Sequence, residues 1–189
     1  MLIADLSHYE GADPDRHPAA WRLAEYLRAI VCGATSIPTD RRLNSGLRCR
    51  RRPGRQPCAG YLQIVRQEEP PHIHWWCGNC DDAGLISGWQ HSAWDLRPPR
   101  SFDEPLLGVD LLPEEHAELR KVHVLDQRIL RLVYGAHWQD GQLWLVGDAE
   151  ELEELSGYVA AAANHVPDRR RQRGLDVLFS KLEGTLTEV

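Results

Sequence analysis

The sequence predicts an α+β protein: an N-terminal helix and a three-stranded antiparallel ribbon, followed by a small α+β domain with a helix, a β-hairpin and two more helices. Two observations predict this class. Four of the five cysteines cluster beside short alternating segments in the first half, whereas longer amphipathic segments with helix-capping residues occupy the second half. A length of 189 residues and 42% hydrophobic content suit one or two small globular domains.

The first helix is expected to begin at Pro18. The residues before it, 1–17, lack periodicity and are rich in Asp, His and Gly, so we expect them to form a loosely docked leader. The segment PAAWRLAEYLRAIVC then places apolar residues near i, i+3, i+4 and i+7. This spacing predicts an amphipathic helix, which Gly33 and then Pro38 end.

Three short strands are predicted after this helix. GYLQIVRQ (60–67) alternates between two sets of side chains, and EEPP turns the chain into HIHWWC (72–77). These two segments predict neighbouring antiparallel strands, and LISGW (85–89) predicts a third.

A proline-rich polar segment, DLRPPRSFDEP, divides the chain. Prolines and polar residues in this proportion are typical of linkers. We therefore predict a first domain of residues 1–95, a linker of residues 96–105 and a second domain of residues 106–189.

The second domain is expected to start with a helix at Pro113, because two glutamates in its first turn suit the helix dipole. RILRLVYGA (128–136) and QLWLVG (142–147) predict strands joined through the Asp140-Gly141 turn.

Two helices are predicted to end the chain. Residues 147–165 form one, with Asp148 as its N-cap, and residues 167–186 form the other, with Asp168 as its cap. The apolar face of the last helix consists of Leu175, Leu178, Phe179, Leu182 and Leu186.

The clustered cysteines follow the pattern Cys49-x8-Cys58 and then Cys77-x2-Cys80. A C-x2-C pair lets two thiolates of one turn bind the same ion, and a second pair from across a hairpin completes a tetrahedral site that suits Zn²⁺. Cys58 precedes one predicted strand and Cys77 ends its antiparallel neighbour, so both lie at the same end of the ribbon. We therefore predict a zinc ribbon, with one structural Zn²⁺ bound by these four cysteines.

The long spacing of the first pair leaves alternatives open. The insert RRRPGRQP has to loop away from the metal, with its bend at Pro53-Gly54, and His72 or His74 is a substitute ligand on one strand face. A redox pair is disfavoured because CGNC follows a strand instead of opening a helix, whose dipole would lower a thiol pKa. The fifth cysteine, Cys32, is expected to be a buried apolar residue.

Arginines surround the first two cysteines, and tryptophans follow them. Four thiolates on one Zn²⁺ leave a net negative charge, so nearby guanidinium groups are favourable around the metal. The other role is contact with phosphates, with indoles stacking on bases, although packing is the alternative for Trp75, Trp76, Trp89 and Trp94. The predicted nucleic-acid-binding residues are Arg50, Arg51, Arg52, Arg55, Trp75 and Trp76.

A second arginine cluster lies in the first turn of the last helix, where cations oppose the helix dipole. Two explanations stay open: pairing with the acidic run of the preceding helix (Glu150, Glu151, Glu153 and Glu154), or contact with an acidic partner or phosphate. The predicted partner-binding residues are Arg169, Arg170, Arg171 and Arg173.

Net charge and motifs limit the function classes. The net charge of −6 arises in residues 96–189, which carry 11 basic and 17 acidic side chains, whereas residues 1–95 carry 11 of each. Free nucleic-acid-binding domains are usually basic, which the chain as a whole is not. No G-x-S-x-G, Walker A or G-x-G-x-x-G motif occurs. We therefore expect no enzyme activity and no small-molecule substrate.

The N-terminus has no signal-peptide pattern, and the longest run of small apolar residues, YVAAAANHV, is too short to cross a bilayer. These two observations predict a cytoplasmic protein without membrane contact.

Three segments together resemble a group of uncharacterised bacterial zinc-ribbon-containing proteins: CRRRPGRQPCAG, HWWCGNCDDAGLISGWQHSAWDL and AAAANHVPDRRRQRGLDVLF. That group has a C-R-R-x-P-G-R-x-x-C-x-G segment, a C-x-x-C knuckle, an I-S-G-W segment and an A-N-H followed by arginines. The likeness spans most of residues 49–182. Its members carry proline and glycine around the knuckle, where this chain has Gly78 and Asp81. The resemblance implies that the four cysteines act together, and it implies no activity.

The function predicted from these observations is that of a non-catalytic regulatory or adaptor protein with structural Zn²⁺, which contacts nucleic acid through its arginine-rich loop. The alternative is a protein–protein interaction module without nucleic-acid binding, in which the acidic second domain engages the partner.

Overall fold

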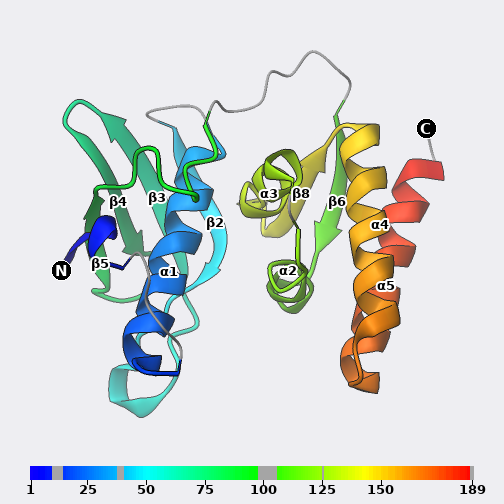
Figure 1. Ribbon diagram of the computed structural model, residues 1–189, viewed down its shortest axis with the longest axis horizontal. Coiled ribbons are helices and arrows are strands. Elements are labelled where there is room, and N and C mark those ends of the chain that lie inside the picture. Colours follow the sequence, from blue (N-terminus) through cyan, green and yellow to red (C-terminus); the bar gives the residue numbers. More distant parts are fainter. Residues whose placement is uncertain (10–14, 38–40, 98–105, 125, 188–189) are drawn as a thin grey trace. The chain divides into compact units, whose positions relative to one another are not determined.

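The computed structural model describes residues 1–9, 15–37, 41–97, 106–124 and 126–187. The chain divides into two compact units, Met1–Pro99 and Arg100–Val189. Each unit combines helices with strands (Figure 1), so the chain is of mixed α+β class. Within the ranges just given, no helix is both long and apolar enough to cross a membrane.

The first unit is built on a mixed sheet whose described strands follow the order β1-β5-β4-β3-β2. β1 runs parallel to β5, and the other neighbours are antiparallel. Helix α1 packs against β2, β3 and β4 and lies across one face of the sheet (Figure 1). The elements are β1 (Leu2–Asp5), η1 (Leu6–Tyr9), α1 (Pro18–Thr35), β2 (Arg42–Arg48), η2 (Pro53–Arg55), β3 (Tyr61–Glu68), β4 (Pro71–Cys77) and β5 (Ala83–Ser87).

Burial alternates along the central strands, because one sheet face carries α1 and the other does not. On β3 and β4, side chains facing α1 are buried, and those between them are almost all half-exposed. Leu62, Ile64, Ile73 and Trp75 are at most 1% exposed, and they pack with the apolar stripe of α1. The period-2 pattern that predicts these strands therefore reports a sheet with one covered face.

The sheet is larger than the predicted three-stranded ribbon. β3 and β4 lie within one residue of their predicted ranges, and β5 begins two residues earlier than predicted. β2 was not predicted because its sequence, RLNSGLR, buries the polar Ser45, whose hydroxyl donates to the Leu62 carbonyl at 2.8 Å. β1 lies in the predicted leader and is held by backbone pairing with β5.

Most of the predicted linker, residues 98–105, lies outside the described residues. The two linker residues that the structure describes, Leu96 and Arg97, belong to the first unit. Leu96 is buried, and its N–H donates to the Thr35 hydroxyl at 3.0 Å. Arg97 bonds the carboxylates of Asp95 and Glu68.

The second unit contains an antiparallel sheet in the order β7-β8-β6, together with four helices among the described residues. Its apolar core combines the inward side chains of β8 and β6 with those of α3, α4 and α5. The elements are β6 (Leu107–Leu111), α2 (Pro113–Leu119), α3 (Gln127–Tyr134), β7 (His137–Gln139), β8 (Gln142–Gly147), α4 (Ala149–His165) and α5 (Arg169–Thr187).

The predicted strand at 128–136 is wrong: most of this segment is helix α3. The Asp126 carboxylate caps the helix by accepting from the Arg128 N–H at 2.6 Å, and Ile129, Leu132 and Val133 form one buried face. The Asp140-Gly141 turn was predicted correctly, with φ of 50° and 83°. It joins β8 to the short strand β7 instead.

Other details of the second unit also differ from prediction. β6 was not predicted, so the unit has three strands where a two-stranded hairpin was expected. Phe179, predicted on the apolar face of the last helix, is 36% exposed, whereas Leu175, Leu178 and Leu182 are buried.

The capping residues of the last two helices are confirmed. Asp168 accepts from the Arg170 and Arg171 backbone N–H groups at 2.7 and 3.3 Å. Asp148 accepts from the Glu151 N–H at 2.8 Å, while the Glu151 carboxylate accepts from the Asp148 N–H at 3.2 Å. This reciprocal pair is a capping box, and it fixes the point at which β8 turns into α4.

Replacing Asp148 with alanine is expected to lower the free energy of unfolding of the second unit by about 1 kcal/mol, because the Glu151 backbone N–H loses its acceptor. Asp148→Asn is the matched control, since asparagine caps helices nearly as well as aspartate. Urea unfolding of the full chain measures both variants. Equal midpoints for the alanine and asparagine variants would contradict the capping role.

Candidate metal centre

The four predicted cysteines converge at one end of the first-unit sheet. Their sulfur atoms all lie within 4.8 Å of one another. The Cys49 and Cys80 sulfurs are 3.7 Å apart, and the Cys58 and Cys77 sulfurs are 3.8 Å apart. Disulfide sulfurs are bonded at about 2.05 Å, so all four are free thiols.

These separations fit a tetrahedral metal ion. Four sulfurs placed at the Zn–S distance of about 2.3 Å lie about 3.8 Å from one another. Two of the sulfur pairs have this separation. The sequence-derived ligand set therefore has the size of a four-thiolate zinc site, and a small contraction of the remaining pairs completes it.

Strand register explains why the two halves of the cluster meet. β3 and β4 are antiparallel, and Leu62 pairs with Cys77. Cys58, which lies just before β3, therefore reaches the same end of the sheet as Cys77, as the sequence predicts. Gly60 makes this approach close: a Cβ atom at this position would overlap the Cys77 sulfur and lie 2.7 Å from the Asn79 Cβ.

Backbone N–H groups point at three of the four sulfurs, each from the residue two positions further along the chain. Arg51 donates to Cys49 at 3.4 Å, Gly60 donates to Cys58 at 3.3 Å, and Asn79 donates to Cys77 at 3.3 Å. Hydrogen bonds of this kind favour the thiolate over the thiol. The turns thus prepare the sulfurs to bind a cation.

The long insert between Cys49 and Cys58 forms a closed loop that extends away from the cluster. The Cys58 N–H donates to the Arg51 carbonyl at 2.9 Å, which joins the two ends of the insert. Beyond this bond the chain bends through η2, where Gly54 has a φ of 59° that favours glycine. The predicted Pro53-Gly54 bend is therefore confirmed, and the eight-residue spacing does not separate the two sulfurs.

The thiols differ in their ionisation. The Gly60 N–H lowers the pKa of Cys58 to about 7, whereas burial raises the pKa values of Cys49 and Cys77. Thiols with raised pKa values are neutral at physiological pH, so a binding metal ion has to displace their protons. Cys32 lies outside the cluster, buried in α1, and burial raises its pKa to about 12.

Two side chains beside the cluster were not predicted. Asp82 is buried; its carboxylate lies 3.5 Å from the Cys49 sulfur and 3.8 Å from the Arg51 Nε. Tyr26 of α1 packs edge-on against Trp75, with ring centroids 5.7 Å apart. Burial, and then the negative charge of Asp82, raise the pKa of Tyr26. The position of Asp82, two residues after the C-x2-C pair, was the available signal.

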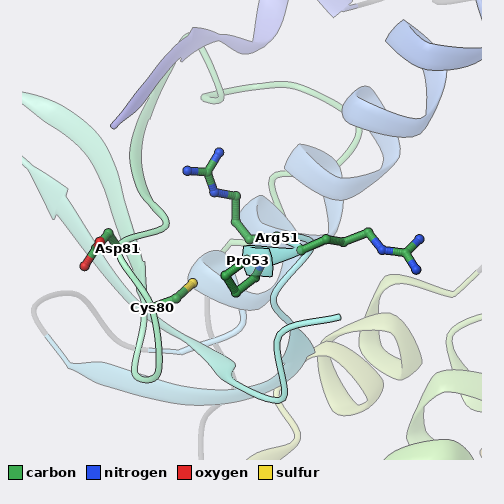
Figure 2. Close-up of a pocket in the computed structure, with 5 residues that line it drawn as sticks. Arg51, Pro53, Cys80 and Asp81 are labelled. Atoms are coloured by element: carbon green, nitrogen blue, oxygen red, sulfur yellow. The ribbon is translucent and has the colours of Figure 1, made fainter. Parts of the chain in front are cut away.

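The arginines of the insert lie at the surface. Arg50, Arg51, Arg52 and Arg55 are all exposed. Arg51 pairs with Asp82, and the Arg50 guanidinium lies 5.2 Å from the centre of the Tyr26 ring. A shallow pocket of about 340 Å³ separates this loop from the C-x2-C turn. Figure 2 shows the Cys80 sulfur turned toward Pro53 across the pocket, with the Asp81 carboxylate turned away.

The predicted tryptophans separate into buried and accessible side chains. Trp75 is 1% exposed and Trp89 is fully buried, so Trp75 is not a base-stacking residue. Its place in the strand gives the reason, because it faces α1. Trp76 points to the opposite face and is partly exposed. Trp94 is also partly exposed, with the Arg28 guanidinium 4.1 Å from its ring centre.

The two histidines of β4 are not part of the cluster. Alternation along the strand places Cys77 on the side of Trp75, and His72 and His74 on the other side. The histidine rings lie 6.2 Å from each other. Their role as substitute ligands is therefore wrong, because they occupy the other face of the sheet.

One explanation for the arginines of α5 was pairing with the acidic run of α4, and these pairs do not form among the described residues. Arg171 instead bonds Glu118 of α2 at 2.9 Å. Two of the acidic residues of α4, Glu150 and Glu154, pair with Arg128 of α3. The other three residues of the cluster, Arg169, Arg170 and Arg173, are exposed.

No family model, curated protein or solved structure matches the chain. The resemblance drawn from the sequence therefore gains no support, and the case for a metal centre depends on the geometry of the four sulfurs.

Proposed function

We propose that the first unit binds one structural Zn²⁺ through Cys49, Cys58, Cys77 and Cys80. The observation that carries this proposal is the spacing of the sulfurs, which is 3.7 and 3.8 Å in two pairs of one cluster. Three backbone N–H groups donate hydrogen bonds to sulfurs of this cluster. Four thiolates fill a tetrahedral coordination sphere and leave no position for an activated water. The proposed role of the metal is therefore to hold the sheet end together, in a protein that is not an enzyme.

Metal analysis of the full-length purified protein tests this site. We expect one zinc per chain, and a cobalt-substituted protein with the absorption bands of tetrahedral thiolate coordination. A protein that folds without any metal, or that binds cobalt with octahedral bands, would contradict the proposal.

We further propose that the arginine-rich loop contacts nucleic acid. Its four arginines are exposed on a loop whose ends are fixed by the Arg51–Cys58 backbone bond and the neighbouring cluster. Arg51 is the one that pairs with Asp82. Exposed guanidinium groups on a loop with fixed ends suit phosphate contacts, because little backbone conformational entropy is lost on binding.

A salt titration with labelled single-stranded DNA and RNA tests this contact. The variant Arg50→Gln, Arg52→Gln, Arg55→Gln keeps Arg51 with Asp82, and it is expected to lower the salt slope by about 0.7 for each lost phosphate contact. The matched control, Arg169→Gln, Arg170→Gln, Arg173→Gln, removes the same charge from α5 and is expected to bind like the original chain. A loss confined to the α5 variant would assign the contact to the second unit.

A second candidate function is protein binding by the second unit. Val177 and Phe179 are 52% and 36% exposed on α5. Val177 lines a hollow of about 380 Å³ with Asp176, Ser180 and Lys181. Exposed apolar side chains beside a hollow are typical of protein contacts. This function is favoured if no oligonucleotide binds even at low ionic strength.

A further inference from the structure

We propose that the sheet face opposite α1 is a stacking surface for single-stranded nucleic acid, centred on Trp76 and Tyr61. This inference rests on the proposed nucleic-acid contact and deepens it, because it names the surface and the type of ligand. The surface is defined by the outward side chains of β2, β3 and β4, and those of β5 and β1 continue it.

Strand register places these side chains in neighbouring rows. Directly paired residues of antiparallel strands share a sheet face. One row contains Arg48 and Tyr61. The next contains Asn44, Gln63, Trp76 and Ala83, and the one after it contains Arg42, Val65, His74, Leu85 and Ile3.

The two aromatic residues lie in adjacent rows. Trp76 pairs with Gln63, and Tyr61 lies two residues before Gln63 on the same strand. Such diagonal neighbours are about 7–8 Å apart. Sheets that bind single strands present two or three aromatic side chains in this way, each stacking on one base.

A guanidinium group accompanies each aromatic ring. The Arg42 guanidinium lies 5.3 Å from the centre of the Trp76 ring, and the Arg48 guanidinium lies 5.5 Å from the centre of the Tyr61 ring. Both arginines are exposed. Planar guanidinium groups stack on aromatic rings and on bases while bonding phosphate oxygens. Each pair therefore offers a stacking plane and a phosphate contact together.

Charge in these three rows favours a polyanion as the occupant. The three rows contain Arg42, Arg48 and His74, and none of their paired positions in the described strands is an aspartate or glutamate. Arg48 is also the last residue of β2, directly before Cys49 and the arginine-rich loop. The arginine-rich loop therefore begins at the edge of this sheet face. A duplex hides its base faces, so the partly exposed rings select a single strand.

Fluorescence anisotropy of the full-length zinc-loaded protein with labelled dT12 and rU12 tests the surface. Trp76→Ala is expected to weaken binding about fivefold or more, and the double variant with Tyr61→Ala more strongly, because each base loses its stacking partner. Trp76→Phe and Tyr61→Phe keep a stacking ring and are expected to stay within about threefold of the original chain. Comparing dT12 with rU12 separates DNA from RNA preference.

The matched control is Trp144→Ala, which removes a partly exposed aromatic ring from β8 in the second unit and is expected to leave affinity unchanged. Circular dichroism and zinc content establish that each variant is folded. If binding survives both alanine changes but is lost with the arginine-loop variant, the stacking surface is wrong and the loop contact stands. If neither oligonucleotide binds at low salt, the proposed nucleic-acid function fails as well. Binding of a duplex more tightly than dT12 would also overturn the stacking surface.

Discussion

Replacing Cys77 with alanine is expected to abolish stoichiometric metal binding and to unfold the first unit, while the second unit stays folded. Cys77 ends β4 and is buried, and its sulfur receives a backbone N–H and lies 3.8 Å from the Cys58 sulfur. Structural zinc contributes on the order of 10 kcal/mol to small domains, which is comparable with the whole stability of a domain. The second unit has its own apolar core, so its unfolding transition should persist.

Metal content per chain and thermal unfolding of the full-length protein measure this result. Cys32→Ala is the matched control, because Cys32 is a buried cysteine outside the four-sulfur cluster. It is expected to retain one zinc per chain and to lose only a small amount of stability. The proposal is contradicted if the Cys77→Ala protein keeps one zinc per chain and the unfolding transition of its first unit is unchanged. The four sulfurs would then not bind one metal ion jointly.

Replacing Gly60 with alanine is expected to lower zinc affinity by about tenfold to a hundredfold, the effect of disturbing a residue that supports metal ligands. Every cysteine remains in this variant. The added Cβ would overlap the Cys77 sulfur and lie 2.7 Å from the Asn79 Cβ, so the C-x2-C turn has to move away from Cys58. Competition with a chromophoric zinc chelator measures the affinity.

Gly78→Ala is the matched control for this prediction. Gly78 lies inside the C-x2-C turn, yet a Cβ there meets only the Gln63 Nε2, at an ordinary contact distance of 3.5 Å. Its zinc affinity is expected to equal that of the original chain. Equal loss in both variants would mean that any substitution in these turns disturbs the metal centre, and that the close approach of Gly60 has no special role.

The convergence of the four cysteines could be predicted from sequence because local spacing and strand order both point to it. The C-x2-C pair needs only one tight turn, and the alternating segments around it fix the register that brings Cys58 to the same sheet end. Asp82 and Tyr26 could not be predicted, because their approach to the cluster depends on how the turn closes and on how α1 lies across the sheet. Burial of Trp75 follows from the same packing.

The strands and helices were harder to predict where they lack a clear local pattern of apolar residues. β1 is only four residues long, and β2 has two buried leucines separated by buried Ser45 and Gly46, so neither shows an extended alternating pattern. The segment of α3 has the branched and aromatic residues that are typical of a strand. It forms a helix, whose N-terminus Asp126 caps. Long helices with charged caps, such as α4 and α5, were predictable because several local signals agree.

The backbone bond between the Cys58 N–H and the Arg51 carbonyl makes the segment from Arg52 to Pro57 an excursion that begins and ends at one point. Its length and sequence are therefore free to vary without changing where the two sulfurs stand. The cost of closing a longer loop grows only slowly with length, so a longer segment here is expected to lower stability only slightly. For protein engineering, this segment is an insertion point at which a foreign peptide would be displayed beside the four-cysteine cluster.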